Sequence, residues 1–205
     1  MKGHIKNLLI DLGVVLLDLN PSRCFDSFRR LGVKNIEQLV DANYKQGLFL
    51  ELEKGNISPA YFRKELCRVS GIQMSDEQID SAWNSFLVDI PAYKLDLLLD
   101  LRKHYSVYLL SNTNSIHWDW VCNHCFTYRG LRAEDYFEKI FLSFEMHLVK
   151  PDEKIFRDVL KDAGINAGET FFIDDAPVNC RMAESLGIET YTPVSGEDWR
   201  HLFEK

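Results

Sequence analysis

Short apolar runs alternate with segments of helical spacing along most of the chain. Runs of this length between turn residues are typical of buried strands, whereas longer amphipathic stretches predict helices. The expected strands are residues 8–10, 107–110, 139–143, 171–173 and 189–192. The expected helices between them are residues 91–105, 151–163 and 177–186. Because strands that alternate with helices form parallel sheets, the pattern predicts an α/β fold with a Rossmann-like parallel sheet core flanked by helices.

One long region breaks this alternation, because its pattern predicts helices alone. Ser58 and Pro59 supply an N-cap and a proline at the first helical position, and Ser75 caps a further helical stretch. We therefore expect a helical subdomain inserted into the α/β core. The boundaries are 20–90 for the inserted subdomain and 1–19 with 91–205 for the core.

Polar side chains follow three of the predicted strands at the point where each strand ends. Asp11, Ser111 and the pair Asp174-Asp175 come directly after apolar runs, and Lys150 opens a predicted helix. The carboxyl ends of parallel strands meet at one edge of the sheet, where open α/β folds bind ligands. We therefore expect three carboxylates, a hydroxyl and a lysine to converge. Such a group suits a divalent metal ion and a phosphoryl group.

Composition and charge exclude several classes of function. The 205 residues carry a net charge of -7, and no basic run is longer than a pair, so we expect no nucleic-acid partner. No apolar stretch approaches the roughly 20 residues of a membrane span, so no membrane partner is expected. The apolar run near the N-terminus is interrupted by Asp11 and Asp18, which argues against a signal peptide.

The five cysteines favour a reducing compartment. Their number is odd, the chain is not small, and free thiols in the cytoplasm fit best. Cys122 and Cys125 have C-x-x-C spacing, but a zinc site needs a second ligand pair, so we do not expect zinc or redox chemistry there. The surrounding stretch, residues 115–131, is irregular and predicts either a long surface loop or a broken helix.

Four segments in a fixed order resemble the signature motifs of the haloacid dehalogenase-like hydrolase superfamily, and the match spans the chain. They are Asp-Leu-Gly-Val-Val at 11–15, Ser-Asn-Thr-Asn at 111–114, Lys-Pro-Asp at 150–152, and Asp-Asp at 174–175 followed by Asn179. The first two segments, and residues 53–58, are similar to a branch of small bacterial sugar-phosphate phosphatases. In this resemblance residues 20–90 correspond to a helical cap.

The resemblance implies a catalytic aspartate and a bound Mg²⁺. Asp11 is the expected nucleophile, which forms an aspartyl-phosphate that water hydrolyses. The expected metal ligands are Asp11, Asp174 and the backbone carbonyl of Gly13, with Asp175 acting nearby through water or as an orienting acceptor. The alternative for the Asp174-Asp175 pair is N-capping of the helix that begins at Pro177.

The remaining motif residues are expected to bind the phosphate. By resemblance, the Ser111 hydroxyl and the backbone N–H of Asn112 hold phosphate oxygens. Lys150 supplies a positive charge for the phosphate and for Asp11, and Asn179 reaches back toward the same place. The predicted function is therefore a Mg²⁺-dependent phosphatase acting on small phosphorylated metabolites, most of all sugar phosphates.

Gly13 departs from the common pattern of these phosphatases. Most of them carry an aspartate two residues after the nucleophile, and this residue protonates the leaving group and later activates water. The substitutes that the sequence offers are Asp18, a residue of the cap, or the substrate itself. Without an acid, a non-catalytic phospholigand-binding or regulatory protein is the alternative function, and a mutase is less favoured. The sequence indicates neither the phosphate ester nor the oligomeric state.

Overall fold

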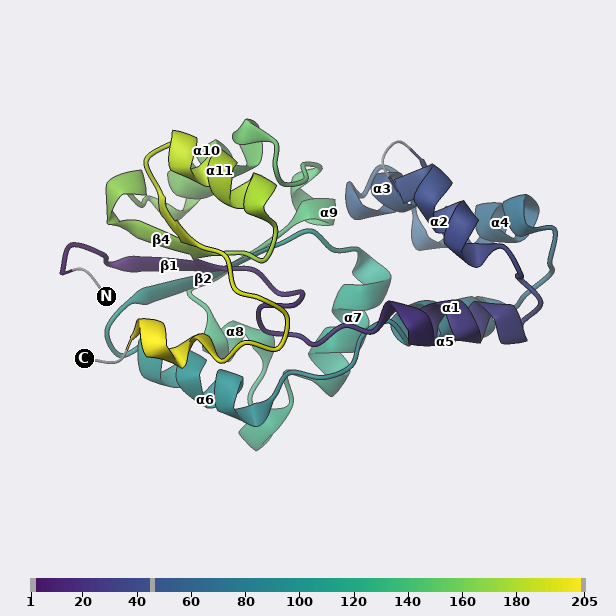
Figure 1. Cartoon of the computed structure of the whole chain (residues 1–205), viewed down its shortest axis with the longest axis horizontal. Coiled ribbons are helices and arrows are strands. Elements are labelled where there is room, and N and C mark those ends of the chain that lie inside the picture. The colour runs from purple at the N-terminus through teal and green to yellow at the C-terminus, as the bar shows by residue number, and fades with distance from the viewer. Residues whose placement is uncertain (1–2, 45–46, 204–205) are drawn as a thin grey trace.

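The computed structural model describes residues 3–44 and 47–203 (Figure 1). Within these residues the strands form one parallel sheet in the order β3-β2-β1-β4-β5. The strands are β1 (Asn7–Ile10), β2 (Ser106–Ser111), β3 (Lys139–Leu142), β4 (Thr170–Ile173) and β5 (Glu189–Tyr191). The chain winds outward from β1 in both directions, so the order reverses beside β1. Ligands of open α/β sheets bind at the carboxyl ends of strands at such a reversal.

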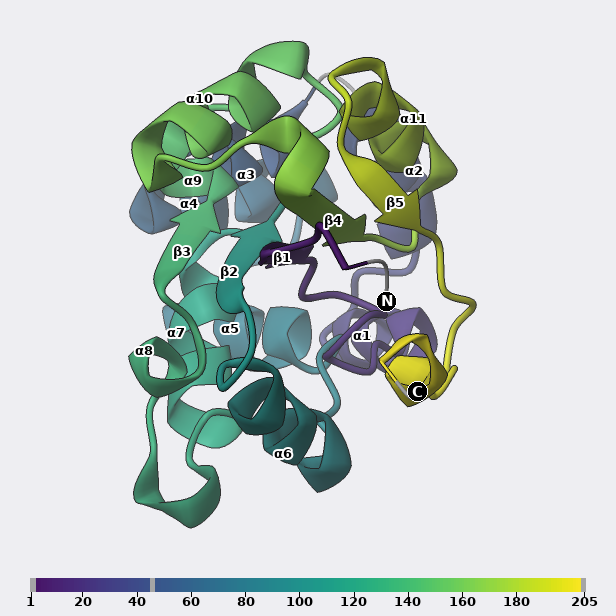
Figure 2. The ribbon, with the colours of Figure 1, turned by 90° about the vertical axis from the view of Figure 1, so that its left-hand side faces the viewer.

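Helices cover both faces of the sheet, which confirms the predicted class (Figure 2). One face carries α10 (Glu153–Ala163) and α11 (Pro177–Ser185), and the other carries α6 (Ala92–Leu101), α7 (Ser115–His124), α8 (Ala133–Tyr136) and the 3₁₀ segment Trp199–Leu202. A hydrophobic core lies on each face of the sheet, and alternate residues of β1 point into one or the other. Leu8 and Ile10 pack with α6, whereas Leu9 packs with α10 and α11. All three are fully buried, as expected for a central parallel strand.

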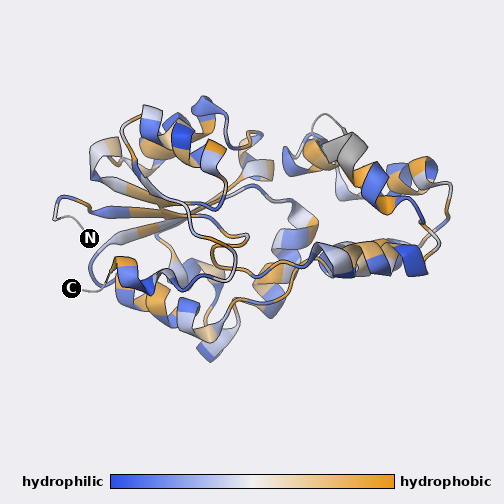
Figure 3. Ribbon diagram, in the orientation of Figure 1, coloured by the Kyte–Doolittle hydropathy of each residue, from blue (hydrophilic) through white to orange (hydrophobic). Residues whose placement is uncertain are grey.

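A separate group of helices lies beyond the carboxyl edge of the sheet, at the right of Figure 1. It consists of α1 (Pro21–Arg30), α2 (Ile36–Tyr44), α3 (Leu48–Glu53), α4 (Pro59–Ser70) and α5 (Asp76–Asn84). Its core is centred on Phe49, Phe62 and Trp83, whose ring centroids lie 5.1–5.9 Å apart. Hydrophobic residues occur in each of these helices (orange in Figure 3), and many of them belong to this buried cluster. We call this group the cap helices.

Helix starts in this group follow the local signals in the sequence. The Ser58 hydroxyl accepts a hydrogen bond from the backbone of Tyr61, and Pro59 is the first helical residue of α4. Ser75 and Gln78 form a reciprocal capping box at the start of α5. Both capping predictions are confirmed, because each depends only on residues within one helical turn.

Two segments differ from the sequence-based expectation. For the stretch 115–131 the sequence predicts either a long surface loop or a broken helix. The structure shows the regular helix α7, capped by Asn114, followed by a 3₁₀ turn at Tyr128–Gly130. Helix α10 begins at Glu153 with Asp152 as its N-cap, so Pro151 precedes the helix instead of opening it. A short helix, α9 (Ser143–Met146), follows β3 directly. Over the described ranges, no helix combines the length and apolar character needed to cross a membrane.

Candidate active site

Lys150 connects the carboxylates that follow two neighbouring strands. Its Nζ lies 2.8 Å from Oδ1 of Asp11, which follows β1, and 2.6 Å from Oδ2 of Asp174, which follows β4. A third hydrogen bond, of 2.9 Å, goes to the carbonyl oxygen of Leu110 in β2. Asp174 and the Lys150 side chain are almost completely buried, and Asp11 is 8% exposed. All three donor hydrogens of the ammonium group are therefore used at the carboxyl edge of the sheet.

Burial and like charge govern the protonation of this group. Burial raises the pKa of Asp11 to about 7, and Asp174 adds to this effect while Lys150 opposes it. Burial alone would lower the pKa of Lys150. The attraction of Asp11 and Asp174 is larger than this effect, so the pKa of the lysine is raised above its ordinary value. Burial, and then Asp174, also raise the pKa of Asp175. The carboxylates thus repel one another and favour an added positive charge.

Asp174 is held by the turn that follows β4. Its Oδ1 accepts hydrogen bonds from the backbone N–H of Ala176 at 2.8 Å and from Nδ2 of Asn179 at 3.0 Å. The N-cap residue of α11 is Ala176, which makes no side-chain cap. The alternative that the Asp174-Asp175 pair supplies the N-cap of this helix is therefore wrong, although Asp174 binds the N–H of the N-cap residue Ala176. Asp175 is instead left half-buried beside the cavity described below.

Asn112 and Ser111 lie at the end of β2, beside Lys150. The Asn112 side chain donates to the carbonyl of Lys150 at 3.0 Å and accepts from its N–H at 2.8 Å. Ser111 is 2% exposed and does not line the cavity described below. The next two residues, Asn112 and Thr113, do line it. The sequence predicts a role for the backbone of Asn112 only, because a side-chain contact across 38 residues has no local signal.

Three carboxylates are close enough to share one cation. Oxygen atoms of Asp11, Asp174 and Asp175 lie within 4.8 Å of one another, and no other cluster of His, Cys, Asp or Glu of this kind occurs among the described residues. The carbonyl of Gly13, the third predicted ligand, accepts a hydrogen bond of 2.6 Å from the N–H of Val15. Val14, between them, has a φ of 62°, an unusual conformation for a β-branched residue.

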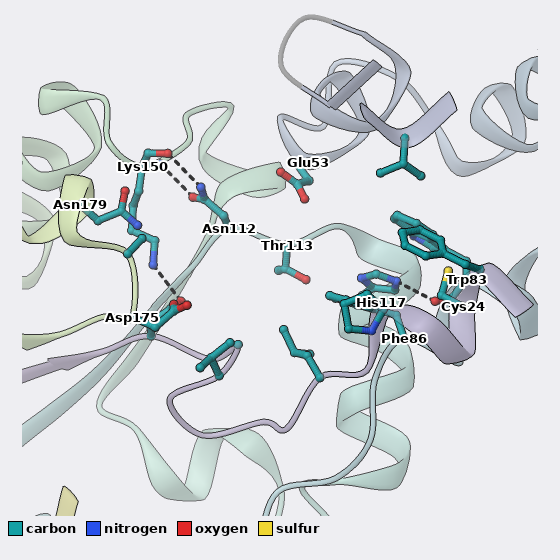
Figure 4. Close-up of a pocket in the computed structure, with 18 residues that line it drawn as sticks. Cys24, Glu53, Trp83, Phe86, Asn112, Thr113, His117, Lys150, Asp175 and Asn179 are labelled. Atoms are coloured by element: carbon teal, nitrogen blue, oxygen red, sulfur yellow. Dashed lines mark hydrogen bonds and ion pairs between the residues drawn. The ribbon is translucent and has the colours of Figure 1, made fainter. Parts of the chain in front are cut away.

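A cavity of about 540 Å³ lies between these residues and the cap helices (Figure 4). On the core side its wall includes Asp11, Gly13, Asn112, Thr113, Lys150, Asp175 and Asn179. On the cap side its wall includes Pro21, Cys24, Phe25, Val40, Glu53, Trp83 and Phe86. The cap side is apolar and aromatic except for Glu53. This volume is sufficient for a small metabolite.

Aromatic stacking forms the end of the cavity farther from Lys150. The His117 ring lies between Trp83 and Phe86, with centroid distances of 4.7 and 5.9 Å, and its Nε2 is 3.3 Å from the carbonyl oxygen of Trp83. Burial lowers the pKa of His117 to about 4, so the ring is neutral at physiological pH. The sequence does not indicate this wall, and His117 falls in a stretch whose pattern is irregular, because the stack forms only when α5 and α7 meet.

Asp18 and the C-x-x-C pair, Cys122 and Cys125, do not line the cavity that contains Asp11. The Asp18 carboxylate is 3.7 Å from Lys94 Nζ and is not part of the cavity wall. Cys122 and Cys125 are free thiols, and burial raises their pKa values to about 11 and 12. Such thiols are poor nucleophiles and poor metal ligands.

The chain is similar to known proteins over most of its length. A family model described as haloacid dehalogenase-like hydrolase matches residues 9–187. The chain is 37% identical over 196 residues to a D-ribitol-5-phosphate phosphatase from Bacteroides thetaiotaomicron, with 96% of this chain and 95% of that protein covered.

Solved structures with the same fold include close relatives in sequence. A HAD family enzyme from Bacteroides thetaiotaomicron, crystallised with magnesium and inorganic phosphate, is 58% identical with a TM-score of 0.94, and the match covers 98% of this chain and all of that one. A predicted HAD-like family hydrolase from Porphyromonas gingivalis is 39% identical with a TM-score of 0.90, over 99% of this chain and all of that one.

Proposed function

The chain belongs to the haloacid dehalogenase-like hydrolase family, and we propose that it is a Mg²⁺-dependent phosphatase of small phosphorylated metabolites, with sugar phosphates as the substrate class. The observation that carries this proposal is the placement of Asp11 and Lys150, in direct contact, on the wall of a cavity of metabolite size. Similarity to a D-ribitol-5-phosphate phosphatase and to an enzyme crystallised with magnesium and phosphate supports it.

The donor set fits Mg²⁺, which prefers hard oxygen ligands and retains water. Asp11, Asp174 and the Gly13 carbonyl would hold the ion, and Asp175 would orient its surroundings. The Gly13 carbonyl uses one lone pair for the Val15 N–H, and the second is available for a metal bond. When bound, Mg²⁺ would neutralise charge on the carboxylates and on the phosphoryl group.

The reaction follows from the position of Asp11. A carboxylate oxygen of Asp11 attacks phosphorus, the ester P–O bond breaks, and an aspartyl phosphate forms. Water then attacks phosphorus, releases inorganic phosphate and restores the carboxylate. Lys150 is a fixed positive charge for the incoming phosphate, and the Ser111 hydroxyl and the Asn112 N–H hold phosphate oxygens. Asn179 keeps Asp174 oriented through its amide group.

Residues 20–90 act as a cap in this proposal, and residues 1–19 with 91–205 act as the hydrolase core. The apolar wall formed by Phe25, Trp83 and Phe86 excludes water from the phosphoryl group and contacts the leaving group. All five cysteines are free, which supports a reducing cytoplasm as the place of action. The partner is a small phosphorylated metabolite.

The absence of a side chain at Gly13 is the observation that favours the alternative, a phospholigand-binding protein without turnover. An assay of phosphorylated metabolites with and without Mg²⁺ distinguishes the two functions. We expect phosphate release that requires Mg²⁺ and disappears in Asp11→Asn, which keeps the volume but removes the nucleophile. Binding of phosphate esters without any release by the wild type would instead establish the alternative, and release by Asp11→Asn would exclude Asp11 as nucleophile.

A further inference from the structure

Glu53 brings a carboxyl group from the cap helices into the cavity that contains Asp11. It is the last residue of α3, and Figure 4 shows its carboxyl directed into the space that Thr113, Lys150 and Asp175 border from the core. Among the described cavity-lining residues of 20–90, Glu53 is the one carboxylic acid. The leaving group of a substrate must extend from the phosphoryl site toward this side of the cavity, because the cap lies opposite the sheet edge.

The backbone around Glu53 is attached to the core. The Ser143 hydroxyl lies 2.7 Å from the carbonyl oxygen of Glu53, and Nδ1 of His147 lies 2.9 Å from the carbonyl oxygen of Lys54. Gly55 has a φ of 63°, and a Cβ there would lie 2.1 Å from the carbonyl oxygen of Phe144. The turn after α3 therefore approaches α9 too closely for any side chain. This contact fixes where the Glu53 carboxyl stands relative to the core.

Asp11 and Asp175 also line the cavity, but the proposed function assigns them to nucleophilic attack and to the surroundings of the metal. The remaining groups around the cavity are poorly suited to protonate a leaving group. Lys150 is committed to Asp11 and Asp174, and Gly13 has no side chain. Burial lowers the pKa of His117 to about 4 and raises that of Cys24 to about 12, so one is unprotonated and the other is too weak an acid.

The surroundings of Glu53 favour the protonated form of its carboxyl more than water does. Burial raises its pKa to about 7, which suits proton transfer in both directions near neutral pH. The titratable groups that share the cavity are Asp11, Cys24, His117, Lys150 and Asp175. The charged side chains with described placement on α2, α4 and α9, which pack on α3, are Glu37, Arg63, Lys64, Glu65, Arg68 and Glu145, with His147 following α9.

We propose that Glu53 is the general acid and base of the reaction, supplied by the cap in place of the side chain that Gly13 lacks; this rests on the proposed phosphatase function. As Asp11 attacks phosphorus and the ester P–O bond breaks, the Glu53 proton passes to the leaving oxygen, which departs as an alcohol. The Glu53 carboxylate then takes a proton from the water that attacks the aspartyl phosphate. Phosphate leaves, and both carboxyl groups return to their starting states.

The test compares Glu53→Gln with Glu51→Gln on two kinds of ester. Glu51 is on the same helix, accepts a hydrogen bond from Asn56 at 2.9 Å and does not line the cavity, so it is the matched control. The esters are p-nitrophenyl phosphate, whose leaving group needs no proton, and a primary alkyl phosphate that the wild type hydrolyses, with D-ribitol 5-phosphate tried first. The readouts are kcat and KM for both esters as a function of pH.

We expect Glu53→Gln to lower kcat/KM for the alkyl ester by about 10²–10⁴-fold while p-nitrophenyl phosphate changes little. Wild-type alkyl hydrolysis should fall as the pH rises through about 7, where Glu53 loses its proton, and Glu53→Gln should lose this dependence. Equal losses on both esters, a rise in KM alone, or an unchanged alkyl rate would overturn the proposal. Continued Mg²⁺-dependent release from p-nitrophenyl phosphate in each variant shows that the phosphatase function stands independently.

Discussion

The side chain of Asn112 forms two hydrogen bonds with the backbone of Lys150: Nδ2 donates to the carbonyl oxygen at 3.0 Å, and Oδ1 accepts from the N–H at 2.8 Å. This pairing imitates one step of a sheet ladder and attaches the loop before α10 to the end of β2. The loop needs such a connection because it carries the lysine that neutralises Asp11 and Asp174. Asn112 is therefore a positioning residue through its side chain.

Asn112→Ala should loosen this loop and impair catalysis. Two hydrogen bonds contribute about 1 kcal/mol each, so the free energy of unfolding should fall by about 1–3 kcal/mol. A displaced Lys150 should lower kcat by about 10-fold or more, because small misplacements in an active site are costly. Denaturant unfolding and steady-state kinetics measure both effects. The control is Asn123→Ala, because the exposed side-chain amide of Asn123 donates to the Asp119 carbonyl of its own helix, at 2.7 Å. Equal effects of the two substitutions would contradict the positioning role of Asn112.

Lys150→Met should destabilise the metal-free protein, and Mg²⁺ should restore much of the loss. The substitution leaves Asp11 and Asp174 buried without their counter-ion, which typically costs about 3–5 kcal/mol. A bound cation supplies the missing positive charge. Unfolding curves in a chelator and in excess Mg²⁺ measure the difference. Lys154→Met is the control, because Lys154 is exposed and pairs with Asp158 within one helix. Destabilisation of the same size with and without Mg²⁺ would argue against a shared site.

Local sequence signals predicted the sheet and most helix ends, because strand burial and capping depend on neighbouring residues. Asp11 and Asp174 could be placed at one edge for the same reason, since each follows an apolar run that becomes a strand. Contacts between distant segments were not predictable. The attachment of Glu53 to Ser143 spans 90 residues, and nothing near Glu53 indicates that its carboxyl faces a cavity.

Resemblance to known phosphatases identifies the family but not the general acid of this site. It correctly identified the family, and it showed that Gly13 lacks the usual acid. It did not indicate which residue could replace that acid, because the contact between the cap helices and the core joins residues that are far apart in the sequence. The structure reduces the choice, since Asp18 is engaged near Lys94 and only Glu53 adds a carboxyl from the described cap residues to the cavity wall.

Glu53→Gln should also change how stability depends on pH. Burial raises the folded-state pKa of Glu53 from 4.5 to about 7, so the protonated form is the one that folding favours. Its contribution to stability is complete below about pH 4.5 and is lost as the pH rises through about 7. Relative to Glu53→Gln, the wild type should therefore lose up to about 3 kcal/mol between pH 5 and pH 8. Unfolding at both pH values tests this, with Glu51→Gln as control, and a constant difference would contradict it.

Gly13→Asp tests the missing acid directly. Gly13 has no left-handed φ, and a Cβ there would lie 3.2 Å from Cδ1 of Leu19, the end of a side chain that can shift by a few tenths of an ångström. An aspartate therefore fits the backbone at this position. If Glu53 already supplies the proton, Gly13→Asp should change wild-type hydrolysis of an alkyl ester by about threefold or less, because one acid suffices.

In the Glu53→Gln background the same substitution should have a much larger effect. A carboxyl at position 13 stands two residues from Asp11 on the cavity wall, so it can reach the leaving oxygen from the core side. We expect Gly13→Asp to restore alkyl hydrolysis by about 10²-fold or more there, with little change for p-nitrophenyl phosphate. Gly13→Ala is the control, since it adds the Cβ without the acid. If Gly13→Asp and Gly13→Ala behave alike on the alkyl ester in both backgrounds, proton donation does not limit this reaction, and the role of Glu53 must lie in binding the substrate.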